Sequence, residues 1–219
     1  MLFLAVTGGF FVENLREHHL EKEHAEEFAK NLIGDLMKDT ADFNEAIASK
    51  QRNVHGIDTL IHVMNQPHYK GQVKDFMRLF GYVKNNYYIT RYDATSQQLT
   101  FSGSLRYFGD MKLYSRLTSY YAQIRKYNDL NNLIYLRIPF IDGLSGIFDF
   151  RDPGDNYHHD RLATDKTEWL SDHSASLNRM ITYSWMVQHM YAGQSNDIVK
   201  LRHQAIELIL EIKKEYDLD

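Results

Sequence analysis

The sequence contains no cysteine, and its 219 residues include only 3 prolines and 12 glycines. The absence of cysteine excludes disulfides, thiolate nucleophiles, cysteine zinc ligands and iron–sulfur clusters. The scarcity of proline and glycine favours long helices over a β fold rich in turns. The composition therefore predicts an all-α fold.

Basic runs are also missing. The net charge is -4 with histidine neutral, and no strongly basic stretch occurs. A general nucleic-acid binder needs a concentrated basic face that displaces counterions from phosphates. We therefore expect no nucleic-acid partner. The hydrophobic share of 43% and charged share of 25% are typical of a folded globular protein.

No hydrophobic run is long enough to span a bilayer, which takes about 20 apolar residues. Residues 1–12 (MLFLAVTGGFFV) are apolar and uncharged, and a charged run begins at Glu13. The basic start of a secretory signal and a small-x-small cleavage pattern are both lacking. Three interpretations stay open: the end of a span whose beginning lies outside this sequence, a shallow membrane anchor, or an apolar segment buried in an oligomer.

Residues 13–65 carry a heptad pattern that predicts one very long helix. Residues 13–27 are almost wholly polar, so this first part is expected to be solvated. Lys50 occupies the one charged position in the seam. The other seam residues are Ala29, Ile33, Leu36, Thr40, Phe43, Ile47, Val54, Ile57, Ile61 and Met64. The seam serves either packing within the chain or self-association.

The remaining sequence predicts further helices joined by short breaks. Residues 133–150 are apolar but interrupted by proline and glycine, and are compatible with short strands or helical turns. Gly193 is expected to stop one helix and Ser195 to cap the last. The predicted helices are 71–82, 88–101, 111–131, 167–191 and 195 to the end. Together they predict an antiparallel multi-helix bundle forming a single domain over 13–219, preceded by the apolar segment 1–12.

One polar loop concentrates possible metal ligands, because carboxylates and imidazoles bind zinc and similar ions. The calcium-loop pattern is not met, and turn-forming aspartates in an ordinary polar loop give the same composition. The candidates, which follow Asp149, are Asp152, Asp155, His158, His159 and Asp160. They support the alternative of a metal- or ligand-binding enzyme, but no catalytic residue or cofactor is assigned.

Histidine and glutamate also pair along the polar helix. His19 lies four residues before Glu23, and His24 lies three residues before Glu27. Such pairs supply two metal ligands, yet the stretch lacks the HExxH pattern. A solvated charged helix gives these spacings as well, and we favour that interpretation.

Three segments carry a resemblance to a known family. Residues 6–39 include an L-x-x-D-L-x-x-D pattern ending at Asp39, and residues 92–121 run from Tyr92 through a Ser-Gly-x-Leu-Arg turn to Tyr120-Tyr121. The third segment is the amphipathic stretch 201–218. In this order they resemble a bacterial family of uncharacterised single-span membrane proteins with a helical extramembrane domain. That family has a basic stub and a full-length span before the point where this sequence begins.

The resemblance implies a bacterial inner-membrane protein whose helical domain is extracytoplasmic. It supplies no catalytic residue and favours a membrane-tethered interaction, sensing or scaffold domain. The expected partners are the membrane, through the N-terminus, and a protein partner or a second copy through the seam. The alternatives are the loop-centred enzyme and a soluble oligomeric structural subunit with residues 1–12 in its interior.

Overall fold

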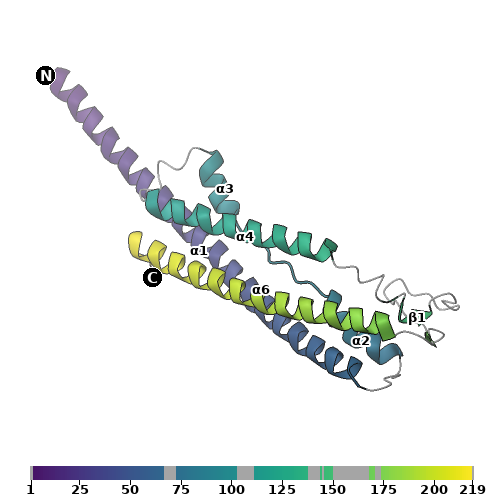
Figure 1. Ribbon diagram of the computed structural model, residues 1–219. Coiled ribbons are helices and arrows are strands. Elements are labelled where there is room, and N and C mark those ends of the chain that lie inside the picture. Colours follow the sequence, from purple (N-terminus) through teal and green to yellow (C-terminus); the bar gives the residue numbers. More distant parts are fainter. Residues whose placement is uncertain are drawn as a thin grey trace. The chain divides into compact units, whose positions relative to one another are not determined.

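The computed structural model describes residues 2–66, 73–102, 111–137, 144, 146–149, 168–170 and 174–218. These residues confirm the all-α fold and the very long N-terminal helix (Figure 1). The helices are α1 (Leu2–Met64), α2 (Val73–Lys84), α3 (Ala94–Phe101), α4 (Met111–Arg137) and α6 (Ser174–Glu215). Two short strands, β1 (Phe148–Asp149) and β2 (Glu168–Trp169), pair antiparallel, with Phe148 opposite Trp169.

Two predictions of secondary structure are wrong. The helix expected over 167–191 begins only at Ser174, and it continues through Gly193 into the last helix. A glycine inside a helix costs about 1 kcal/mol, and burial of Tyr191 and Ile198 on either side of Gly193 outweighs that cost. Residues 88–93, expected to be helical, have no regular secondary structure.

The chain divides into two compact units. Unit 1 comprises Met1–Phe43, Thr90–Lys126 and Lys200–Asp219, and unit 2 comprises Asn44–Ile89 and Tyr127–Val199. The helices α1 and α6 each supply residues to both units without a break. The single domain over 13–219 and the separate segment 1–12 stay predictions.

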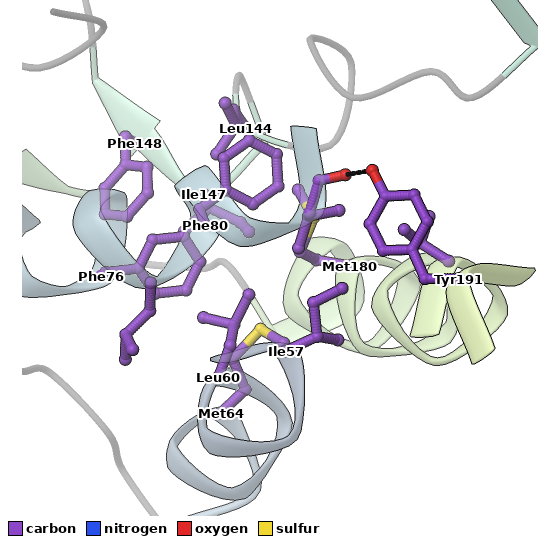
Figure 2. Close-up of a cluster of buried hydrophobic side chains, with 13 residues drawn as sticks. Ile57, Leu60, Met64, Phe76, Phe80, Leu144, Ile147, Phe148, Met180 and Tyr191 are labelled. Carbon is purple, nitrogen blue, oxygen red and sulfur yellow. Dashed lines mark hydrogen bonds between the residues drawn. The ribbon is translucent and has the colours of Figure 1, made fainter. Parts of the chain in front are cut away.

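Unit 2 contains an aromatic-rich core (Figure 2). Phe76 of α2 meets the ring of Phe148 edge-on, with the ring centroids 5.1 Å apart. A Cβ atom on Gly56 would collide with the ring of Tyr82, so the absence of a side chain there lets α2 approach α1 closely. The buried members are Ile57, Leu60, Met64, Phe76, Leu79, Phe80, Val83, Leu144, Ile147, Phe148, Met180, Val187 and Tyr191.

Unit 1 buries apolar residues of α1, α4 and α6. They include Ala29, Leu32, Leu36, Phe43, Leu113, Leu117, Ile124, Leu201, Ala205, Leu208 and Ile212. Across both units every heptad-seam residue of α1 from Ala29 to Met64 is buried or half-buried within the one chain. The seam therefore packs inside the chain, which was one of its two expected uses.

Candidate functional site

The segment between α2 and α3, residues 85–93, is here called the connector. It has no regular secondary structure, so its backbone N–H and C=O groups lack the partners that a helix or sheet supplies. Side chains of the helices bond to it instead. The boundary between the units falls after Ile89, so residues 85–89 of the connector belong to unit 2 and residues 90–93 to unit 1.

In unit 2 the connector is bonded through its carbonyl groups. Asn53 of α1 donates from Nδ2 to the carbonyl of Asn85 at 2.8 Å, and Tyr191 of α6 donates from its hydroxyl to the same oxygen at 2.8 Å. Asn128 of α4 donates to the carbonyl of Ile89 at 2.9 Å. Three helices therefore fix the path of this half.

In unit 1 the connector is bonded through its N–H groups. Asp39 and Asp42 of α1 accept N–H groups of the connector, and Asp35 accepts the N–H of Thr95 just beyond it in α3. We call these three carboxylates the aspartate ladder. Their spacing of four and three residues places them on one helix face. The N···O distances are 2.6 Å for Thr90 to Asp42, 3.0 Å for Tyr92 to Asp39 and 3.1 Å for Thr95 to Asp35.

Asp35, the first aspartate of the ladder in the sequence, also caps the helix α3. Asp93, the N-cap residue of α3, makes no side-chain capping bond. Asp35 takes over this role from α1, since it accepts both the N–H and the hydroxyl of Thr95 in the first turn. The carboxylate of Asp35 therefore joins α3 to α1.

Asp39 is the most buried of the three carboxyl groups in the aspartate ladder. Asp39 is 0% exposed, and Tyr120 of α4 donates its hydroxyl to Oδ2 at 2.8 Å. Burial raises the pKa of Asp39 to about 7, because the bonds from Tyr92 and Tyr120 offset only part of the lost hydration, and Asp35 and Asp42 add like charge. This carboxyl group exchanges a proton near neutral pH.

The tyrosines around Asp39 are proton donors and not nucleophiles. Burial, followed by the charge of Asp39, raises the pKa of Tyr120 and of Tyr121 above the usual range. Both hydroxyls therefore stay protonated, and Tyr121 donates to the carbonyl of Tyr92 at 2.9 Å. The arrangement can bind a proton and hold the connector.

Unit 2 contains a second buried ionisable group. Lys50 of α1 is 0% exposed, and its Nζ donates to Oδ1 of Asn86 at 2.8 Å. The same nitrogen lies 4.3 Å from the ring centroid of Tyr191, within the range of a cation–π contact. Burial lowers the pKa of Lys50 to about 7, because the charged amine loses its hydration.

Two hollows indent the surfaces of the units. In unit 1 a cleft of about 210 Å³ is lined by Arg116, Tyr120 and Glu207 among others, and Arg116 pairs there with Glu207 and Glu211. In unit 2 a groove of about 510 Å³ runs past His55, Asp58 and other residues of α1 and α6. Neither hollow is lined by Asp39 or Lys50.

The metal-binding loop predicted from the sequence lies outside the described residues. This applies to Asp152, Asp155, His158, His159 and Asp160, and the backbone of Asp149 ends β1. Within the described ranges no three histidine, aspartate or glutamate side chains gather as metal ligands. The metal site therefore stays a prediction.

The histidine–glutamate pairs on α1 are exposed. His19 Nε2 lies 3.3 Å from Glu23 Oε1, with 75% and 61% of the two side chains accessible. His24 and Glu27 lie 4.0 Å apart on another face of the helix, with 54% and 72% of the two side chains accessible. This agrees with the interpretation of a solvated charged helix.

The sequence contained part of the signal for the site. Asp39 and Tyr92 were noted in the segments that carry the family resemblance, as were Tyr120 and Tyr121, and the structure brings these four together. Lys50 was visible as the charged interruption of the heptad seam. The asparagines that hold the connector were missed, because a single polar residue on a helix leaves no periodic trace.

Comparison of the chain with protein families, curated proteins and solved structures finds no significant match.

Proposed function

We propose that the protein is a membrane-tethered helical domain with an interaction, sensing or scaffold role. The observation that carries the proposal is the exposed N-terminal part of α1. Residues 7–9 and 11–24 are all exposed, and Phe11 and Val12 are 66% and 65% accessible. Ala25 is the first described buried residue of this helix. Figure 1 shows this purple part of α1 as bare helix.

Apolar side chains in this position favour transfer into a lipid or protein environment. Burial of one such side chain contributes about 1.5–3 kcal/mol. In the described part of the chain, no helix is long and apolar enough to cross a membrane. A tether through residues 1–12 therefore rests on the apolar composition of that segment, on Phe11 and Val12, and on the solvated polar helix that follows from Glu13.

The test is flotation of the full chain with lipid vesicles, together with alkaline-carbonate extraction of cell membranes. We expect the wild-type chain to float, and the double variant Phe11→Asp/Val12→Asp to lose at least about tenfold of its bound fraction, since each charge opposes insertion. Phe101→Asp is the matched control, because Phe101 is 84% exposed elsewhere in unit 1. Equal flotation of the two mutants would refute the tether.

The same exposed residues also support the soluble oligomeric subunit, in which the N-terminal segments of several chains cover one another. Gel filtration without lipid separates the two proposals. A tethered monomer elutes at the mass of one chain when detergent covers Phe11 and Val12. An oligomer keeps its size in detergent and falls apart in the double variant.

Orientation is a further part of the proposal. The resemblance to single-span bacterial proteins favours an extracytoplasmic helical domain in the inner membrane. Protease added to intact spheroplasts should then degrade residues after Glu13. Complete protection until the membrane is permeabilised would place the domain on the cytoplasmic side.

A further inference from the structure

Lys50 is a buried amine that has no carboxylate partner among the described residues. The side chain is 0% exposed, and within the described ranges it makes one hydrogen bond, to Asn86, and one contact with the ring of Tyr191. Buried charges in proteins are normally paired or bound to metal. Loss of hydration alone lowers the pKa of Lys50, and no carboxylate of the described residues contributes.

In the part of the chain that the structure describes, the groups that contact the amine are the uncharged amide of Asn86 and the aromatic ring of Tyr191. On α1 the neighbours Ser49 and Asn53 are uncharged, and the connector presents Asn86. The titratable group facing the amine from α6 is Tyr191, whose hydroxyl is engaged with backbone carbonyls. The charged groups nearest in sequence, Glu45 and Arg52, pair with each other at the exposed surface.

The contacts of Lys50 are also those that hold the connector. Asn86 belongs to the connector, and Tyr191 donates to the carbonyls of Val83 at 3.1 Å and Asn85 at 2.8 Å (Figure 2 draws the first of these bonds). Asn86 is incompletely bonded, since its buried Nδ2 has no hydrogen-bond partner among the described residues. The side chain of Asn86 therefore links the charge of the Lys50 amine to the position of residues 85–89.

We propose that protonation of the Lys50 amine releases residues 85–89 from the helices of unit 2 that hold them, and that loss of this proton docks them. The ring of Tyr191 attracts a cation, but one ring and one amide oxygen replace only part of the hydration of an ammonium group, so the docked state favours the uncharged amine. An ammonium group has three donors and a charge, and it regains hydration when the segment that covers it moves away. We expect the connector to be the segment that moves. It is held by hydrogen bonds from side chains, whereas the helices have their own backbone hydrogen bonds.

The direction of the pH dependence follows from proton binding. The amine in the docked state takes up its proton only near pH 7, whereas in the released state it does so near the ordinary value of 10.5. The released state therefore binds more protons between these values. Release becomes more favourable by about tenfold for each pH unit of acidification in that interval, and levels off below about pH 7. This device is independent of the membrane tether.

The experiment is hydrogen exchange of the full chain, measured at the amide of Asn85, which donates to the carbonyl of Gly81 at 2.9 Å. Exchange is followed from about pH 6.5 to 9.5 and expressed as protection relative to an unstructured peptide. In the wild type we expect protection to rise about tenfold per pH unit above about pH 7.5. The Lys50→Met variant keeps the apolar stem and should show no such slope. Lys30→Met, at an exposed position of the same helix, should behave as the wild type.

Two further measurements keep the test decisive if Lys50→Met does not fold. Direct titration of the Lys50 side chain by NMR in the wild type should give a midpoint well below that of exposed lysines. Tyr191→Phe should raise exchange at every pH and keep the slope, since it removes the carbonyl bonds and retains the ring. An ordinary midpoint for Lys50, or the same slope in wild type and Lys50→Met, would overturn the proposal.

Discussion

Asp39 and Lys50 project from the same helix into the interior, one in each unit, and neither has an oppositely charged partner among the described residues. Each exists in the neutral form at a pH where an exposed side chain of its type is charged. Burial has the opposite effect on the pKa of the two groups, because it disfavours the charge in both. At the residue scale the protein therefore responds to pH near neutrality.

For Asp39 the response can be measured as stability. The pKa of Asp39 is raised in the folded state from the ordinary value of 3.8 to about 7, so the folded state binds more protons than the unfolded state between these values. The contribution to stability is present in acid and is lost as the pH rises from about 4 to about 7.

We predict that Asp39→Asn, which imitates the protonated carboxyl group, becomes more stable than the wild type as the pH rises through this window. The gain should be on the order of a few kcal/mol at about pH 7.5 and small at about pH 4.5. Urea unfolding at several pH values measures it. Asp129→Asn, at an exposed position of α4, should show no such trend; a parallel pH profile for Asp39→Asn and the wild type would contradict the prediction.

At the scale of the elements, the sequence was most informative where apolar residues repeat. The heptad pattern over residues 13–65 predicted the end of α1, and the proline at position 67 agrees with that end at Met64, whereas the helix begins already at Leu2. The continuity of α6 through Gly193 could not be predicted, because it depends on the burial of Tyr191 and Ile198, which lie on either side of this glycine. Residues 88–93 were assigned to a helix since nothing local shows that α1 and α4 supply their hydrogen-bond partners.

The close approach of α2 to α1 gives a test at this scale. We predict that Gly56→Ala destabilises the protein by about 1–3 kcal/mol, because the new methyl group collides with the ring of Tyr82 and overpacks the contact. Gly34→Ala is the matched control on the same helix, where an added Cβ meets nothing within 4 Å.

Gly34→Ala should be neutral or stabilising by up to about 1 kcal/mol, since alanine favours the helix. Thermal or urea unfolding of the two variants compares them directly. Similar effects of both substitutions would mean that Tyr82 moves aside without cost.

At the scale of the whole molecule, the two units are joined through their longest helices. The boundary falls inside α1 between Phe43 and Asn44, and inside α6 between Val199 and Lys200. Unfolding one unit would create new helix ends in the other, with unsatisfied backbone groups. We therefore expect the units to unfold together.

The two tryptophans make this measurable, since Trp169 and Trp185 both belong to unit 2. Tryptophan fluorescence reports on that unit, whereas far-UV circular dichroism reports on the helices of both. We predict coincident urea midpoints and slopes from the two probes. A fluorescence transition separated from the loss of helix by more than about 0.5 M urea would show that the units unfold independently.

The hydrogen bonds that hold the connector also determine which substitutions, insertions and deletions its sequence tolerates. Its bonds to the aspartate ladder and to Asn53 and Asn128 use its own backbone, which every residue type except proline carries in full. Substitutions in residues 87–92 leave these bonds in place, whereas one inserted or deleted residue shifts every N–H and C=O away from its partner. We therefore expect the length of the connector to be fixed and its residue types to vary more freely. The side chains that determine its path belong to the helices that surround it.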